Sequence, residues 1–152
     1  LLDEPWSNVD PSLRESLHAA CAAEARARNV TVKDLERSAG EILDAFLGSP
    51  LLKTFQELDI VGREVPFEAA VGGRLLHGAI DLLYRRGGAY VVADFKTDRA
   101  RPGPGPGMEK ELLARYAPQL AAYAEAVQAA LKLPRPPEWE IWALRSGRVL
   151  TV

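Results

Sequence analysis

The sequence contains very little cysteine: Cys21 is the only one among 152 residues. A single cysteine excludes an internal disulfide framework, and it excludes a zinc site or an iron–sulfur cluster held by four cysteines of this chain. Apolar runs are short as well. None approaches the roughly 20 residues of a membrane-spanning helix, and no stretch resembles a signal peptide. We therefore expect a protein of the cytoplasm without membrane contact.

An excess of positive charge is also missing, because 19 lysines and arginines stand against 21 aspartates and glutamates, a formal net charge of −2. Proteins that bind nucleic acid usually carry a basic face, so this balance argues mildly against DNA contact. A bound metal ion would supply local positive charge and weaken that argument. The length and the 47% hydrophobic content suit one buried core rather than two.

Hydrophobic periodicity and turn residues divide the chain into a helical first third, a strand-rich middle and a mixed last third. Glycine pairs separate the middle strands, which favours an antiparallel meander, and alternating proline and glycine at 101–107 predict a loop. The predicted elements are helices at 11–29, 31–47 and 51–58, strands at 60–70, 74–84 and 89–96, a helix at 109–131, and strands at 138–144 and 148–152. This order indicates a mixed α/β or α+β fold.

Asp94 and Lys96 close the apolar run Val91-Val92-Ala93. Residues two apart in a strand point to the same side, so this acid and this base should share one face of the sheet. For an isolated Asp-x-Lys, an ion pair at an exposed strand end is the favoured explanation, because surface ion pairs are common. The pair becomes informative only together with other polar residues.

Asp81 is a lone acid within the apolar strand predicted at 74–84, which should pair with the strand that carries Asp94. Two carboxylates brought together in a low-dielectric place repel each other, which raises a pKa or recruits a cation. Hard oxygen ligands suit Mg²⁺ or Mn²⁺, and Lys96 beside them would stabilise the charge of an attacked phosphate. The alternative is an Asp81 that hydrogen-bonds a turn.

The helix predicted at 109–131 adds Tyr116, Gln119 and Tyr123, which fall within about 60° of one another on one helical stripe. Apolar residues lie on the same stripe, so we expect it to be the buried face of the helix. A buried glutamine needs hydrogen-bond partners, and a carboxylate, a water or a phosphate would serve. A packed tyrosine pair with a satisfied amide is the alternative.

Four stretches together resemble a known family: Glu64-Val65-Pro66-Phe67, Gly78-Ala79-Ile80-Asp81, Asp94-Phe95-Lys96-Thr97-Asp98, and Tyr116-Ala117-Pro118-Gln119-Leu120-Ala121-Ala122-Tyr123. They resemble the RecB-like nucleases of the PD-(D/E)XK superfamily, and within it the C-terminal nuclease domain of AddA-type helicase–nucleases. The likeness runs from about residue 15 to the end. It implies a restriction-endonuclease-like fold, with a central mixed sheet of about five strands flanked by helices.

The resemblance also implies roles for residues of this sequence. Asp81 and Asp94 would ligate the metal, with the Phe95 carbonyl as a further ligand and Lys96 as the catalytic lysine. Gln119 and Tyr123 would form the glutamine–tyrosine helix motif of the family, near the scissile strand.

A histidine on the first helix is another metal ligand of the family, and His18 is the candidate here. The glycine that usually precedes this histidine is absent from residues 13–17. Glu64 matches an acid often seen in the first strand. His77 shares strand parity with Asp81, so it would face the same site or cover the sheet. Some relatives carry an iron–sulfur cluster, which a single cysteine rules out here.

We thus expect residues 1–152 to be a single nuclease domain, excised from a longer helicase–nuclease chain. It would be a Mg²⁺- or Mn²⁺-dependent deoxyribonuclease that hydrolyses phosphodiester bonds during DNA end processing in recombination and repair. Its partners would be DNA, as single strands or duplex ends, a covalently linked helicase and a partner subunit. Arginines 85, 86, 99 and 101 would bracket the site or form a solvated rim.

Two other interpretations of the sequence stay open. One is a catalytically silent nuclease-fold module that only scaffolds a helicase complex or contacts DNA. The other is an unrelated α+β binding domain whose polar residues coincide by accident.

Overall fold

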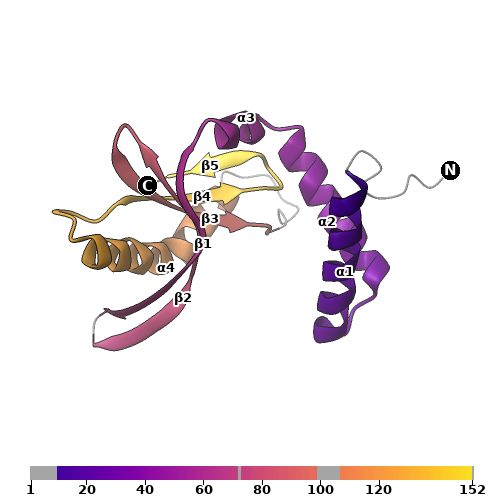
Figure 1. Cartoon of the computed structure of the whole chain (residues 1–152), viewed down its shortest axis with the longest axis horizontal. Helices are drawn as coiled ribbons and strands as arrows, with labels where there is room; N and C mark the ends of the chain where they lie inside the picture. Colours follow the sequence, from indigo (N-terminus) through magenta and orange to yellow (C-terminus); the bar gives the residue numbers. More distant parts are fainter. Residues whose placement is uncertain (1–9, 72, 99–106, 152) are drawn as a thin grey trace.

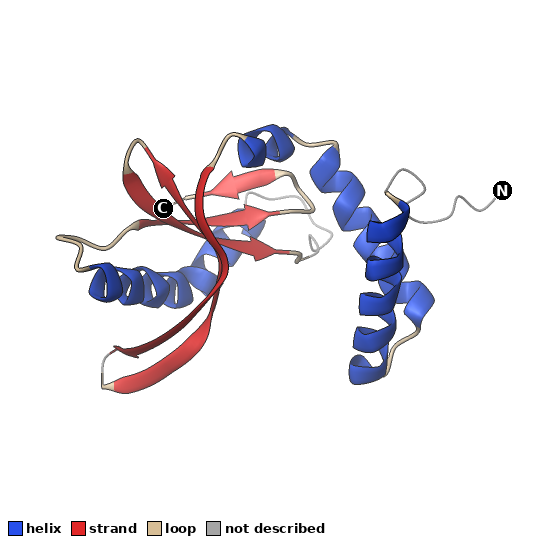
Figure 2. Cartoon of the chain, in the orientation of Figure 1, coloured by secondary structure: helices blue, strands red, loops and turns tan. Residues whose placement is uncertain are grey.

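A computed structural model describes residues 10–71, 73–98 and 107–151. Four helices and five strands follow one another in these ranges (Figures 1 and 2). The helices are α1 (Pro11–Arg28), α2 (Val32–Leu47), α3 (Pro50–Gln56) and α4 (Gly107–Leu131). The strands are β1 (Asp59–Val71), β2 (Arg74–Arg86), β3 (Ala89–Lys96), β4 (Glu138–Ala143) and β5 (Arg148–Leu150). Each predicted element is present, whereas most of the loop predicted at 101–107 lies outside the described residues.

The first three helices begin where the sequence supplies a side-chain acceptor for their free amide groups. The Asp10 side chain accepts hydrogen bonds from the first turn of α1, Thr31 accepts one from the amide of Asp34 in α2, and Ser49 accepts one in α3. Such caps satisfy amides that have no partner within the helix. A proline at the first position of α1 and of α3 reinforces both starts.

The strands form one sheet in the order β1-β2-β3-β4-β5. The first three strands are an antiparallel meander, as predicted, and the β2–β3 turn places Gly87 and Gly88 at φ values of 58° and 83°. Glycine adopts such values without the steric cost that a side chain would add. β4 runs parallel to β3, and α4 is the connection that makes this possible. The sheet is therefore mixed.

Helices cover the two faces of the sheet, and each face has its own apolar cluster. One cluster joins α4 to alternate strand residues, including Ile80, Leu83 and Val92. The other joins α3 to Leu82, Val91 and further residues of β2, β3 and β4. Neighbouring residues of β3 thus belong to opposite faces, as strand geometry requires. The α4 face is the one that matters for the polar residues described below.

The strands β1 and β2 continue past the end of β3 as a two-stranded ribbon, which Figure 1 shows extending beside α4. Where the ribbon joins the rest of the sheet, side chains of β2 stop alternating regularly between the two faces. Ile80 and Leu83 both belong to the cluster under α4, although they are three residues apart. On the paired strand β1, Glu64 has φ 48°. This left-handed conformation is unfavourable in free energy for any residue that has a side chain. Asp81 lies within this irregularity.

The helices α1 and α2 pack against each other and stand away from the sheet (Figure 1). Arg145, which follows β4, connects them to it. Its guanidinium donates to the Thr97 carbonyl at 2.9 Å, to Ser38 Oγ at 2.8 Å and to Glu41 Oε2 at 3.1 Å. One side chain thus holds α2 against the end of β3.

Two further features of the helices bear on function. Pro118 lies inside α4 and is exposed. Proline has no amide hydrogen, so the carbonyl of Ala114 loses its helical partner. In the part of the chain that the structure describes, no helix has the length and apolarity needed to cross a membrane.

Candidate active site

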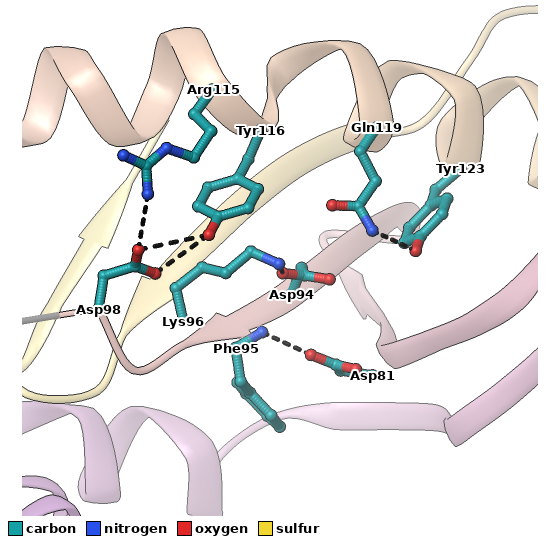
Figure 3. A network of polar contacts seen from close by, with 9 residues as sticks. All are labelled: Asp81, Asp94, Phe95, Lys96, Asp98, Arg115, Tyr116, Gln119 and Tyr123. Carbon is teal, nitrogen blue, oxygen red and sulfur yellow. Dashed lines mark hydrogen bonds and ion pairs between the residues drawn. The ribbon is translucent and has the colours of Figure 1, made fainter. Parts of the chain in front are cut away.

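The last residues of β3 carry a buried acid and a base on the face covered by α4. Asp94 is only 4% exposed. It has the same strand parity as Val92, a member of the cluster under α4. The Lys96 ammonium makes an ion pair with Asp94 Oδ2 (Figure 3). Asp94 and Lys96 therefore share one face, as the sequence predicted, and this pair is buried rather than displayed at a surface.

Asp81 reaches β3 from the neighbouring strand. The backbone register of β2 and β3 begins at Leu82 and Ala93, so Asp81 and Asp94 follow at the adjacent position where the strands separate. There the amide of Phe95 donates a hydrogen bond of 2.7 Å to Asp81 Oδ2 instead of to a backbone carbonyl (Figure 3). This bond fixes Asp81 beside Asp94 and uses one carboxylate oxygen. We attribute the position of the Asp81 side chain, which points toward β3 rather than to a face of the sheet, to the irregularity of β2.

The charges around Asp94 are out of balance. Burial raises the pKa of the Asp94 carboxyl above its ordinary value of 3.8, the nearby Asp81 charge raises this pKa further, and Lys96 partly opposes both effects. Among the described residues, Asp94 Oδ2 has the ion pair with Lys96 and no further hydrogen bond. A buried carboxylate that lies beside a second acid and has a single lysine as its charged partner remains costly. A second positive charge near Asp81 and Asp94 would reduce that cost.

The donor set suits a hard divalent cation. Carboxylate and backbone carbonyl oxygens are the ligands that Mg²⁺ and Mn²⁺ prefer. Within residues 10–71, 73–98 and 107–151, no cluster of three or more His, Cys, Asp or Glu side chains is suited to a metal ion. A site here would therefore depend on two acidic side chains, Asp81 and Asp94.

A second polar group surrounds Lys96 from the side of α4. The Tyr116 ring lies under the Lys96 ammonium, with 4.0 Å from Nζ to the ring centroid. The Tyr116 hydroxyl donates to Asp98 at 3.2 Å, and Arg115 pairs with the same carboxylate at 2.9 Å (Figure 3). No site role was predicted for Tyr116, Asp98 or Arg115. The position of Tyr116 three residues before Gln119 was the only signal for this group.

Gln119 and Tyr123 lie further along α4, one turn apart. Gln119 Nε2 donates to the Tyr123 hydroxyl at 2.5 Å, and the Tyr123 ring packs edge-on against Phe67 of β1, with centroids 4.9 Å apart. The prediction that the whole stripe is buried is wrong at Gln119, which is exposed. The ribbon of β1 and β2 leaves this part of α4 open. The amide can therefore contact a bound molecule without first losing a protein partner.

The structure does not bring His18 to the two carboxylates. Helix α1 packs on α2, away from the sheet (Figure 1), and His18 Nδ1 lies 2.6 Å from Glu36 Oε1. Its predicted place among the metal ligands therefore finds no support in the packing of α1. Glu64 and His77 are both exposed. Glu64 lies on the strand that pairs with β2 around Asp81, and His77 lies further out on the ribbon.

The prediction that arginines bracket the site is wrong for the two that the structure describes, and both are exposed, as the alternative of a solvated rim requires. Arg85 and Arg86 lie at the turn between β2 and β3, at the opposite end of β3 from Asp94. Arg85 stacks over Tyr90, and Arg86 pairs with Glu140. Each arginine thus has a partner within the fold. Residues 99 and 101 lie outside the described ranges.

Comparison with known proteins agrees with this geometry. Residues 2–150 match the family model of the PD-(D/E)XK nuclease superfamily. The chain belongs to this superfamily. The mixed five-stranded sheet with helices on both faces is consistent with the nuclease fold of the superfamily, so the fold expected from the sequence is confirmed.

Individual relatives are much longer proteins. The chain is 31% identical over 96 residues to the A subunit of an ATP-dependent helicase/nuclease from Lysinibacillus sphaericus, and 35% identical over 96 residues to its namesake from Anoxybacillus flavithermus. These matches cover 58% and 60% of this chain but 8% of each relative. A third protein of that name, from Desulforudis audaxviator, is 43% identical over 58 residues, which are 38% of this chain and 4% of the relative. The chain is thus a nuclease-type domain that spans less than a tenth of these relatives.

Proposed function

We propose that this chain is a divalent-metal-dependent DNA nuclease domain. The observation that carries the proposal is the meeting of Asp81, Asp94 and Lys96 at the end of β3, where Asp94 is buried beside a second acid and has Lys96 as its charged partner. Membership of a nuclease superfamily supports the reaction class. The metal dependence and the substrate rest on the chemistry of these three residues.

In this proposal Asp81 and Asp94 would hold Mg²⁺ or Mn²⁺, with the Phe95 carbonyl as a further ligand. The ion would supply Lewis-acid activation of the phosphate and of the attacking water. Asp81 meanwhile keeps the Phe95 backbone in place through its hydrogen bond. Lys96 brings a fixed positive charge to the oxygens of the attacked phosphate, where charge develops.

Gln119 and Tyr123 would contact the nucleic acid strand. Gln119 is exposed, and its hydrogen bond to Tyr123 orients an amide that still has a carbonyl oxygen and one amide hydrogen to offer. Both side chains project from α4 on the stripe that also carries Tyr116 (Figure 3). Their task in the proposal is to position a strand relative to Asp94 and Lys96.

The names of the relatives suggest a wider setting. We propose that the 152 residues are one domain of a longer helicase–nuclease that processes DNA ends in recombination and repair and works with a partner protein. With a net charge of −2, the domain would obtain most of its DNA affinity from linked parts rather than from its own surface. Such a domain alone would cut slowly.

The silent-module alternative is disfavoured by one observation. A domain that had lost its chemistry would be free to lose the buried acid or its lysine, because Asp94 without a task is a burden on the fold. Both residues are present and in contact. We therefore treat the scaffold role as the second candidate.

A cleavage assay decides between the two candidates. End-labelled linear DNA and closed circular DNA would be incubated with the wild-type chain and with Asp94→Ala, each with and without Mn²⁺. Metal-dependent cutting by the wild type alone supports the proposal, and cutting of the circular substrate identifies endonuclease action. Undiminished cutting by Asp94→Ala would overturn the assignment of the site. No cutting by the wild type on any substrate would favour the scaffold role.

A further inference from the structure

Lys96 has two neighbours of different chemistry. On one side lies the Asp94 carboxylate, with which it makes an ion pair. On the other side lies the face of the Tyr116 ring, 4.0 Å from Nζ to the centroid. An ammonium within about 6 Å of an aromatic face is attracted by the negative charge density of the ring. The lysine therefore occupies a position between a carboxylate and an aromatic face (Figure 3).

The ring of Tyr116 is fixed independently of Lys96. Its backbone belongs to α4, and its hydroxyl donates to Asp98, two residues beyond Lys96, at 3.2 Å and 3.4 Å to the two oxygens. Arg115 pairs with the same Asp98 carboxylate at 2.9 Å. The ring is thus held at both ends, and its face would stay in place if the lysine moved.

The two neighbours of Lys96 respond differently to a bound cation. A divalent cation at Asp94 would take the oxygen that the ammonium now contacts, and two positive charges at one buried carboxylate repel each other strongly. The Tyr116 ring carries no net charge and would be unaffected. Lys96 would then leave Asp94 and keep its aromatic neighbour.

We propose that Tyr116 is a positioning residue, whose ring face retains Lys96 beside the site when a cation takes over Asp94. In the metal-free chain the Lys96 ammonium occupies the position at that carboxylate that a cation would take. When a cation binds, the ring keeps the Lys96 side chain from moving into solvent. The inference rests on the proposed function and adds to it a side chain that acts only through the lysine. The face of the ring contacts Lys96, and the hydroxyl helps to orient the ring through its hydrogen bond to Asp98.

The test measures the exposure of the Lys96 amine directly. An acetylating reagent followed by peptide mass spectrometry gives the modification rate of Lys96, with the exposed Lys33 and Lys132 as internal references. The wild type is compared with Tyr116→Leu, which removes the ring, and with Tyr116→Phe, which removes only the hydroxyl. Tyr116→Met repeats the ring removal with a longer side chain in case Tyr116→Leu does not fold.

With saturating Mn²⁺ we expect Lys96 to react roughly 2- to 30-fold faster in the ring-less variants than in the wild type, the range that a cation–π contact supports. Tyr116→Phe should stay near the wild-type rate. The Mn²⁺ affinity, measured by calorimetry, should be similar in all of them, because Tyr116 is not a ligand. Lys96→Met should bind Mn²⁺ more tightly than the wild type, since no ammonium competes for Asp94.

Equal Lys96 reactivity in all variants would overturn the proposal, and so would a Tyr116→Phe that behaves like Tyr116→Leu. Loss of Mn²⁺ binding in the ring-less variants would assign Tyr116 a structural role instead. The proposed function fails separately: if the wild type binds no Mn²⁺, both ideas fall. If Mn²⁺ binds and DNA is cut but Tyr116 leaves Lys96 unchanged, this inference falls alone.

Discussion

The two faces of the sheet each contain one buried acid, and the two acids are treated very differently. Glu140 of β4, 3% exposed, lies on the α3 face, where its carboxylate accepts from Tyr84 at 2.7 Å and from Trp142 at 3.1 Å and pairs with Arg86. Asp94 of β3, 4% exposed, lies on the α4 face, where Oδ2 has the Lys96 ammonium as its partner and Asp81 is a neighbouring acid.

Asp94 and Glu140 are therefore equally buried but differ in how far their charges are compensated. A carboxylate with three donors is compensated both in its lone pairs and in its charge. A carboxylate that lies beside another acid and has one lysine as its partner would be stabilised by a bound cation. The contrast supports the proposal that the active site lies on the α4 face.

The largest effect is expected from a substitution on the α4 face. Asp94→Ala should lower metal-dependent cleavage by roughly 100- to 1,000-fold or more, because the site loses charge stabilisation where the reaction needs it. The melting temperature without metal should stay unchanged or rise, since a buried carboxylate has gone. Calorimetry and a cleavage time course measure both. A large loss of metal-free stability would make Asp94 a structural acid like Glu140.

The next largest effect is expected from a substitution on the α3 face. Glu140→Gln replaces one carboxylate oxygen by an NH₂ group, which then faces a donor, either Arg86 at the Oε1 position or the Trp142 ring nitrogen at the Oε2 position. The change should cost about 2–3 kcal/mol of unfolding free energy in urea titrations. The low end is appropriate because the Arg86 side chain is 53% exposed and can turn to water. The cleavage rate of the folded variant should not change. A stable Glu140→Gln that loses activity would contradict the division of the faces.

A smaller change sharpens the comparison. Tyr84→Phe removes one donor from Glu140 but leaves Trp142 and Arg86, so it should cost about 1 kcal/mol. Its effect should disappear in a Glu140→Gln background, where the acceptor is already altered. Urea titrations of the single and double variants form the required cycle.

The smallest effect is a difference in pH dependence. Because burial raises the pKa of Asp94 above 3.8, the folded chain holds this proton where the unfolded chain has lost it. Asp94 therefore contributes stability that is complete below pH 3.8 and is lost as the pH rises through the folded-state pKa. Unfolding free energies of the wild type and Asp94→Asn, compared from pH 3.8 upward without metal, should diverge in favour of Asp94→Asn. Parallel curves would contradict the assigned pKa shift.

Much of the fold could be predicted from the sequence because local signals were strong. Prolines and capping side chains mark the helix starts, and the Gly87-Gly88 turn marks a hairpin. The polar residues of β3 also followed from strand parity. The break in alternation at Asp81 could not be predicted, because it depends on the backbone of the paired strand β1, which has a register shift between Ile60 and Gly62 and a φ of 48° at Glu64.

The other differences have equally physical causes. His18 was assigned from likeness alone, and the packing of α1 on α2 leaves it beside Glu36 rather than near Asp94. Glu140 was missed although it directly precedes the apolar run Ile141-Trp142-Ala143, a signal similar to the one that singled out Asp81. The role of Tyr116 required the three-dimensional position of Lys96.

Pro118 divides α4 into two segments with separate duties. Tyr116 lies before it, next to the lysine, and Gln119 and Tyr123 lie after it, next to the ribbon. With the bond to the Ala114 carbonyl missing, the helix can flex at this point at lower cost than elsewhere. In the proposed nuclease, movement of the ribbon as a DNA strand enters would be absorbed at this joint, while Lys96 would keep its alignment with the attacked phosphate.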